Sequence, residues 1–177
     1  QIKFDEHSDT GLGNILADQI QSANRAFVQY IEENYPGFIS AETRPQMVHD
    51  TVQNAVVPKL NEGKKVCLLV LDCMRHDHFR TLMPELRTLF DINIEASLAL
   101  IPSATPYSRN AIFSGLFPNE FCKKYPEQIE AMKQEKGVNR LEELFLNDQL
   151  KRLGLSNVKL HYHKIWKVSE GNKFQSR

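Results

Sequence analysis

Residues 65–72 read KVCLLVLD, and this stretch decides the fold that we expect for the chain. The run from Val66 to Leu71 is short and continuously apolar, and it is bounded by Gly63 and Asp72. Such a run is typical of a strand buried on both faces, as strands in a parallel sheet are. The pattern therefore predicts an α/β domain.

The segments after this run complete a βαβ unit in the same interpretation. Residues 76–90 have apolar positions at helical spacing, with Pro84 as a place where the helix could divide. Residues 92–101 alternate and then become apolar, and residues 158–165, VKLHYHKI, alternate with period two. Both patterns predict strands, and the crossover should be right-handed. Further helices are predicted over residues 105–114, 127–136 and 141–153.

Two more helices are predicted before this unit. Apolar residues recur every three or four positions from Leu16 to Ile31, and a second apolar stripe lies within residues 45–60. The pair Pro36-Gly37 separates them. We expect a helical hairpin within a linker region of residues 1–63, serving as a packing layer or as a connector from an upstream domain. Residues 64–177 would form the α/β domain.

The composition excludes several classes of protein. The 177 residues include 22 basic and 22 acidic ones, for a formal net charge of +0, which argues against coating nucleic acid or a membrane surface. No apolar run approaches the roughly 20 residues that span a bilayer. Cys67, Cys73 and Cys122 form no close C-x-x-C pair, which favours reduced thiols in a cytoplasmic protein. Because the chain begins with Gln1 and its last residues read as a break, we expect a piece of something longer.

Two polar residues follow consecutive predicted strands. Asp72 comes directly after the first, and Thr105, followed by Pro106, comes shortly after the second. Because open α/β sheets bind ligands at the carboxyl edge, we expect Asp72 and Thr105 to lie close together there. A carboxylate can ligate a divalent cation, and a threonine at a helix N-cap would lie beside free N–H groups, those of Tyr107 and Ser108, that suit a phosphate. A metal-bound hydroxyl could act as a nucleophile.

The same residues also have purely structural interpretations. An aspartate after a strand is often the N-cap of the next helix, and a Thr-Pro pair is often only a helix start. The pairs His76/His78 and His161/His163 could ligate a metal, but surface or core positions are the more usual outcome at such spacings. The residues alone leave the two interpretations nearly even.

Two motifs taken together resemble a known family. The stretches LLVLDCMRHDHF and SLALIPSATPYSRNAIFSGLFP look like the start of a PglZ domain of the alkaline phosphatase superfamily, with the close match over Lys65–Pro118. The helical region before them resembles the linker that joins such domains to a phospho-receiver domain in bacterial response regulators. The resemblance implies a partial alkaline-phosphatase-like parallel sheet flanked by helices.

This resemblance implies a role for each residue of the first motif and for the threonine. Thr105 would be the catalytic nucleophile and also a metal ligand. Asp72 would be a ligand of the same metal. Arg75 and Asp77 would form an ion pair that steadies the loop, which a structural interpretation predicts as well.

The second motif supplies Arg109 and Asn110, which could bind phosphate oxygens or simply belong to a solvated helix face. The superfamily holds two metal ions, expected to be zinc, with further Asp and His ligands from the later half of the domain. Asp148, His161 and His163 have no fitting context in the sequence. We therefore expect the remaining ligands to lie outside this chain.

The expected function is that of a partial effector domain in a two-component response regulator, of metal-dependent phosphohydrolase or phosphodiesterase type. The full-length protein would cleave a phosphate ester or diester, whereas this fragment alone would be inactive. The alternative is a non-catalytic signalling or protein-interaction module on the same fold. A nucleotide-binding domain is a remoter third reading, without a G-x-G-x-x-G or G-K-[ST] motif to support it. The expected partner is an upstream phospho-receiver domain, no membrane is involved, and a homodimer is left open.

Overall fold

A computed structural model of the chain describes residues 10–41, 43–134, 140–167 and 170. The chain divides into two compact units. The first comprises Gln1–Pro45 and Leu71–Ala96, and the second comprises Gln46–Val70 and Ser97–Arg177. Each unit has its own helices.

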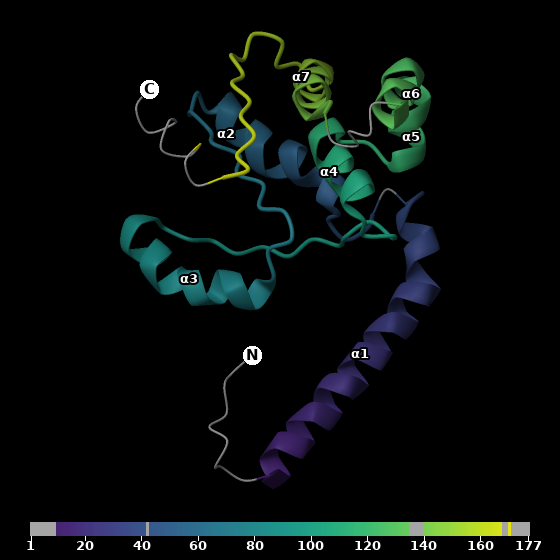
Figure 1. The fold of residues 1–177 in the computed structure, drawn as a ribbon, viewed down its shortest axis with the longest axis vertical. Coiled ribbons are helices and arrows are strands. Elements are labelled where there is room, and N and C mark those ends of the chain that lie inside the picture. Colours follow the sequence, from purple (N-terminus) through teal and green to yellow (C-terminus); the bar gives the residue numbers. More distant parts are fainter. Residues whose placement is uncertain (1–9, 42, 135–139, 168–169, 171–177) are drawn as a thin grey trace. The chain divides into compact units, whose positions relative to one another are not determined.

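The first unit contains two of the predicted helices. Helix α1, Thr10–Phe38, is unbroken and longer than predicted, with Pro36 inside it rather than at its end (Figure 1). Helix α3, His76–Leu89, confirms the helix expected over residues 76–90, and Pro84 lies inside it without dividing it. The periodic spacing of apolar residues therefore located both helices correctly.

The second unit begins with helical turns of three kinds and continues with four α-helices. The second helix predicted near residue 45 is a succession of a 3-10 turn, a π-helix and an α-helix rather than one regular helix. In chain order the elements are η1 (Val48–Asp50), η2 (Val52–Val56), α2 (Val57–Asn61), α4 (Thr105–Ser114), α5 (Pro118–Lys124), α6 (Pro126–Gln134) and α7 (Glu142–Arg152). Helix α1 belongs to the first unit and α2 to the second, and the helical hairpin predicted within residues 1–63 stays a prediction.

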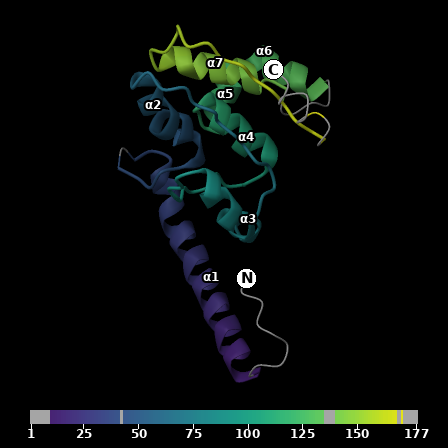
Figure 2. The ribbon, with the colours of Figure 1, turned by 90° about the vertical axis from the view of Figure 1, so that its left-hand side faces the viewer.

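The core of the second unit is an apolar cluster to which α4, α5 and α7 contribute. Figure 2 shows these three helices next to one another. Phe145 of α7 is fully buried, and the rings of Tyr125 and Phe121 lie 4.8 and 6.1 Å from it. Burying such side chains is the main favourable contribution to folding. The cluster consists of Val52, Val56, Phe113, Phe121, Tyr125, Phe145, Leu146 and Leu150.

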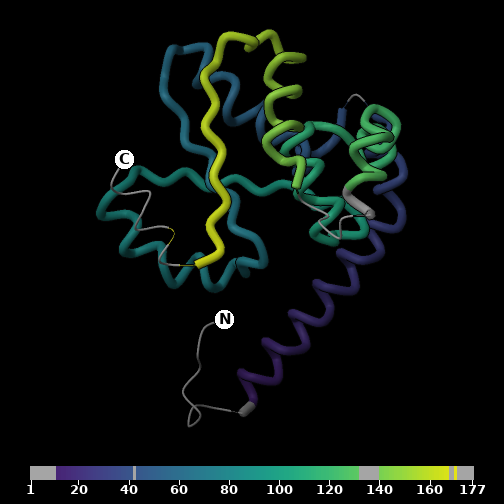
Figure 3. The backbone as a smooth tube through the Cα atoms, turned by 45° about the horizontal axis from the view of Figure 1, so that its top comes forward, coloured from purple at the N-terminus to yellow at the C-terminus, as the bar shows by residue number. Residues whose placement is uncertain are grey.

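The predicted parallel sheet, and with it the βαβ unit, is wrong. Within the described ranges no segment forms a strand, and strand-like pairing is limited to an isolated parallel bridge between Met47 and Leu98. Residues 158–166 run as an extended segment beyond α7 (Figure 3). The alkaline-phosphatase-like sheet inferred from the sequence is therefore not seen.

The physical reason lies in how the extended segments are covered. Alternate residues of segments 64–70 and 158–166 do pack on the core of the second unit, so the period-two pattern is real. The opposite side is open, since Leu69 is 71% exposed and Cys67, expected inside a buried strand, is exposed too. A parallel strand needs hydrogen-bonded neighbours and cover on both faces, and the described residues supply cover on one face only. The core-facing residues are Leu68, Val70, Val158, Leu160 and Tyr162.

Helices α4 and α7 pack so closely that residue 115 has no room for a side chain. Gly115 ends α4 in the left-handed region, with φ of 64°. A Cβ atom there would lie 2.1 Å from the side-chain amide of Gln149 on α7. Gln149 is buried, and its amide donates to the Phe113 carbonyl at 2.9 Å, so it cannot easily move aside. The glycine thus serves both the turn and the packing of α4 on α7.

We predict that Gly115→Ala lowers the free energy of unfolding by about 2 kcal/mol or more, because the left-handed backbone and the steric conflict both act against it. Urea denaturation of the chain measures this. The matched control is Gly154→Ala, where φ is 81° but a Cβ atom would meet no atom within 4 Å. It should cost only about 1 kcal/mol, from the backbone alone. Equal effects of the two substitutions would show that the contact with Gln149 is not important.

Candidate functional site

Asp72 lies in an exposed turn between the extended segment 64–70 and helix α3. The next residue, Cys73, has φ of 57°, and its thiol lies 3.6 Å from the Asp72 carboxylate. A left-handed backbone is uncommon for a non-glycine residue and costs about 1 kcal/mol or more. Such strained positions cluster at functional sites, so the turn that presents Asp72 is a candidate for function.

The same loop contains an ion pair between Arg75 and Asp77. Arg75 is the N-cap residue of α3, and its guanidinium donates to both Asp77 oxygens, at 3.0 and 2.7 Å. Desolvation raises the pKa of Asp77, but the hydrogen bonds and charge of Arg75 outweigh it, so the pKa lies below its usual value. The Arg75 side chain is 65% exposed, so this pair orients the loop without contributing much stability.

Helix α4 begins with Thr105, but the residue at its N-cap position is Ala104. The prediction of Thr105 as the N-cap is therefore wrong by one residue. The N–H groups of Tyr107 and Ser108, expected to be free for a phosphate, both donate to the Ala104 carbonyl at 3.0 Å. Within the described part of the chain we find no hydrogen bond to the Thr105 hydroxyl. Among the described residues, the Thr105 hydroxyl is thus not used to cap the helix.

Arg109 lies one helical turn after Thr105, on the same face of α4. Its guanidinium is paired with Glu142, the first residue of α7, at 2.6 and 2.8 Å from the two carboxylate oxygens. The Glu142 side chain is fully buried and that of Arg109 is 16% exposed. The structure therefore engages Arg109, a candidate phosphate ligand, in a contact between two helices.

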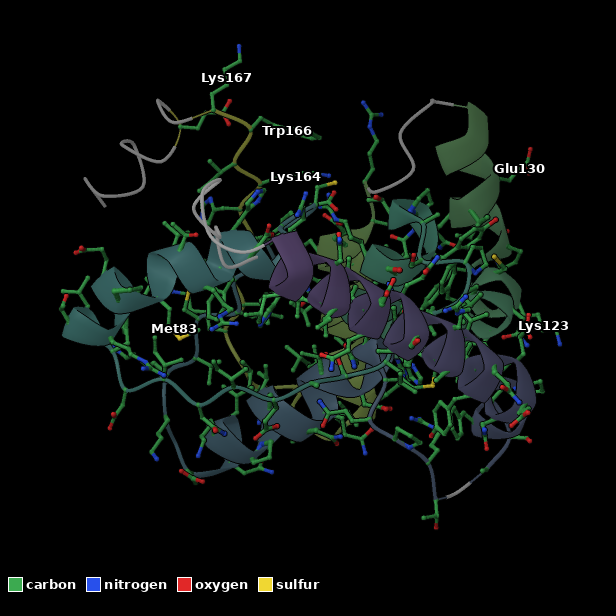
Figure 4. The ribbon with its side chains drawn as sticks, turned by 90° about the horizontal axis from the view of Figure 1, so that it is seen from below. Met83, Lys123, Glu130, Lys164, Trp166 and Lys167 are labelled. Carbon is green, nitrogen blue, oxygen red and sulfur yellow. The ribbon has the colours of Figure 1, made fainter. Side chains whose placement is uncertain are left out.

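Two further groups approach the Glu142 carboxylate. The Tyr162 hydroxyl donates to it, and the Lys164 ammonium lies 3.5 Å away. Burial and the Glu142 carboxylate both raise the pKa of Tyr162. The Lys164 ammonium also lies 4.9 Å from the centre of the Trp166 ring, and Figure 4 shows both side chains on the same extended segment. The Glu142 carboxylate is thus approached by two cations, Arg109 and Lys164, and by one hydroxyl, that of Tyr162.

Sequence reasoning missed Glu142 because its partner Arg109 is 33 positions away. The available signal was an acidic residue in the first turn of the predicted helix 141–153, which is expected on any helix surface. Nothing in the local pattern distinguishes a buried carboxylate from a solvated one.

Asn110, the other candidate phosphate ligand, is buried in the second unit. It is 1% exposed, and its side-chain amide donates to the Pro106 carbonyl at 2.7 Å. This contact lies within α4 and supports its first turn. A role in binding phosphate remains a prediction for Asn110, as it does for Arg109.

Asp72 belongs to the first unit and Thr105 to the second. The sheet edge that was expected to bring them together is absent from the described residues. No three Asp, Glu, His or Cys side chains gather as metal ligands in the part of the chain that is described. The described residues therefore do not by themselves fit a two-metal centre.

Comparison with known families shows which family the chain belongs to. Residues 51–174 match the family described as the BREX system PglZ alkaline phosphatase-like domain, and residues 1–39 match the PorX response regulator linker domain. Because the first match covers more than half of the chain, the chain belongs to the PglZ family. The resemblance inferred from the two sequence motifs is confirmed. No curated protein sequence matches the chain.

These matches define the general character of the protein. The chain joins a response regulator linker segment to an alkaline phosphatase-like domain, a class that suggests dependence on a metal in general terms. Among the described helices, none is long and apolar enough to cross a bilayer.

We predict that Arg109→Ala lowers the free energy of unfolding by about 3 kcal/mol, because it leaves the buried Glu142 carboxylate without its closest cation. The matched control is Arg75→Ala, which removes an arginine from an exposed pair and should leave stability close to that of the parent. Thermal and urea denaturation of the two variants measure the difference. If Arg109→Ala is as stable as the parent, the pair with Glu142 does not hold α4 on α7.

Proposed function

We propose that the chain is part of the effector region of a response regulator, and that its PglZ domain hydrolyses a phosphate ester or diester. The observation that carries the proposal is the Thr105 hydroxyl, which begins α4 inside the family match and is not used to cap the helix. A hydroxyl at a helix start experiences the positive end of the helix dipole, which favours an anionic substrate.

Thr105 is proposed as the nucleophile. Its hydroxyl would lose a proton as its oxygen attacks phosphorus, and the ester oxygen would take up a proton and leave as an alcohol. Water would then cleave the bond between phosphorus and the threonine oxygen, which releases phosphate from a monoester substrate or a phosphate monoester from a diester. Arg109 lies one turn further along α4 and would contact phosphate oxygens of the substrate. Arg75 and Asp77 would keep the Asp72 turn in its conformation.

Zinc is the proposed cofactor, with Asp72 and Thr105 as two of its ligands and with two ions in the complete centre. Aspartate carboxylate is a suitable zinc ligand, and catalytic zinc sites usually have three protein ligands. The described residues do not assemble such a set. We therefore attribute to Asp72 and Thr105 only the capacity to contribute ligands, with the others expected elsewhere in the full-length protein.

The second candidate is a non-catalytic signalling or interaction module. The observation that favours it is the match of residues 1–39 to a response regulator linker, together with the lack of an assembled ligand set among the described residues. In either case we propose an upstream phospho-receiver domain as partner and a cytoplasmic location. Residues 1–63 would be the linker region and residues 64–177 the PglZ portion.

In the full-length protein, we predict that Thr105→Val lowers hydrolysis of a phosphate ester or diester by roughly a thousandfold or more, because the nucleophile is lost. Valine keeps the shape of threonine, so the unfolding transition should be retained. Thr105→Ser, which keeps a hydroxyl, is the control and should keep part of the activity. Rates of hydrolysis and melting curves, measured on the same variants, distinguish loss of the nucleophile from loss of the fold. Hydrolysis by Thr105→Val at the parental rate, with parental metal content, would favour the interaction module.

The chain of 177 residues by itself is predicted to bind zinc only weakly and to lack phosphatase and phosphodiesterase activity, because two ligands do not complete a zinc site. Titration with zinc, followed by calorimetry, measures the affinity. Asp72→Asn should weaken the binding further, whereas Asp91→Asn, at another exposed aspartate, should leave it unchanged. Tight binding of two ions by the parent chain, with turnover that Thr105→Val abolishes, would show that the chain carries the whole centre.

A further inference from the structure

The carboxylate of Glu142 gathers polar groups from two other parts of the second unit. Both contacts with Arg109, at 2.6 and 2.8 Å, are made by one guanidinium nitrogen, Nη2. The Tyr162 hydroxyl donates to the same carboxylate, and the Lys164 ammonium lies 3.5 Å from it. These groups come from α4 and from the extended segment after α7, and the carboxylate itself is fully buried. The carboxylate is therefore the point that fixes their arrangement.

Stability alone is a weak explanation for this network. Removing two opposite charges from water costs free energy, and well-packed apolar side chains in place of a buried ion pair often give a protein of equal or greater stability. A buried carboxylate with several donors does fix the direction of each donor, because every donor has to point at it. The geometry thus favours a role in holding a side chain in one orientation.

Arg109 is the partner whose orientation matters for the proposed chemistry. It follows Thr105 by four residues on α4, so the two side chains are neighbours on one face of the helix, with about 5–6 Å between their Cβ atoms. The Arg109 side chain is 16% exposed, so it reaches the surface of the unit. A guanidinium binds phosphate through pairs of N–H groups, which requires a defined direction. An arginine that is held before the substrate arrives also loses less rotamer entropy on binding.

Helix α7 carries a second carboxylate with the same kinds of partner. Like Glu142, Asp148 has a tyrosine, a lysine and an arginine beside it. These are Tyr125, Lys124 and Arg152. None of the three belongs to α4, the helix that begins with Thr105. The two clusters therefore allow the effect of losing a carboxylate on α7 to be separated from an effect on Arg109.

We propose that Glu142 is a positioning residue for the phosphohydrolase reaction, and that it holds the Arg109 guanidinium in the direction in which it contacts the phosphoryl group at Thr105. The inference rests on the proposed function, since it needs a phosphate substrate at the start of α4. Tyr162 and Lys164 hold the Glu142 carboxylate as the carboxylate holds Arg109. Helix α7 and the segment after it thus support a substrate contact that α4 makes.

The test measures KM and kcat of the full-length protein for a phosphate ester or diester, together with the inhibition constant of inorganic phosphate. Glu142→Gln keeps the shape of the side chain and removes the charge that holds Arg109. It should raise KM and the inhibition constant roughly tenfold and lower kcat less, because binding of phosphate oxygens is weakened. Tyr162→Phe removes one hydrogen bond to the carboxylate and keeps the ring against Phe113, and it should raise the same two constants about threefold.

A control and a double variant distinguish positioning from loss of stability. Asp148→Asn should lower the melting temperature without changing KM or the inhibition constant. Because Glu142 acts through Arg109, adding Glu142→Gln to Arg109→Ala should raise KM no further than Arg109→Ala alone. Equal changes in KM from Asp148→Asn and Glu142→Gln would overturn the inference. Effects of Glu142→Gln and Arg109→Ala on KM that simply add would do so as well.

Thr105→Val, measured alongside, separates this inference from the proposed function. Loss of hydrolysis in Thr105→Val, with parental KM and inhibition constant in Glu142→Gln and Tyr162→Phe, would overturn the positioning role and leave the proposed function standing. If Glu142→Gln does not fold, Tyr162→Phe decides between the same outcomes. Parental hydrolysis by Thr105→Val would overturn both proposals.

Discussion

The buried ion pair between Arg109 and Glu142 is the interaction on which the second unit depends. A fully buried carboxylate is costly unless cations and hydrogen-bond donors surround it. Glu142 obtains them from Arg109 on α4 and from Tyr162 and Lys164 on the extended segment after α7. Three parts of the chain that are distant in sequence are thereby held at one point. The helix that begins with Thr105 owes its position to this arrangement.

A second polar cluster acts at the other end of α7. Asp148 accepts a hydrogen bond at 2.5 Å from Tyr125, the residue that follows α5, and is paired with Lys124 at 3.0 Å and Arg152 at 2.8 Å. Desolvation raises the pKa of Asp148, but these donors outweigh it and lower the pKa to about 2. Arg152 also donates to the Ser114 carbonyl at the end of α4. Helix α4 is therefore tied to α7 at two places, in its middle through Arg109 and at its last residue through the Ser114 carbonyl.

This scaffold separates the roles of residues that are close neighbours in the sequence. Arg109 and Asn110 are engaged in contacts that hold α4, whereas the hydroxyl of Thr105 takes no part in them. The proposed nucleophile thus stands on a helix that its neighbours hold in place, as a functional site requires. In the first unit, the turn at Asp72 also presents an exposed polar group from a defined backbone, because Cys73 keeps a left-handed conformation beside the carboxylate.

The sequence by itself identified the family and located several of the helices. The spacing of apolar residues located α1 and α3, because this signal acts over a few neighbouring residues. The two local motifs were enough to identify the PglZ family. The predicted proximity of Asp72 to Thr105 is of another kind, because it depended on a sheet that would bring distant segments together.

Only the tertiary structure decided which alternating segments would pair and which charges would be buried. Residues 158–166 do alternate, yet they remain unpaired among the described residues, because a strand exists only when a neighbour takes up its backbone hydrogen bonds. The local sequence predicts Glu142 to be an ordinary surface acid. Its side chain is nevertheless fully buried, because Arg109 of α4, 33 positions away, forms an ion pair with it. Helices form from contacts within one turn, whereas sheets and buried ion pairs depend on contacts between distant segments, and the sequence pattern of one segment does not specify its partner.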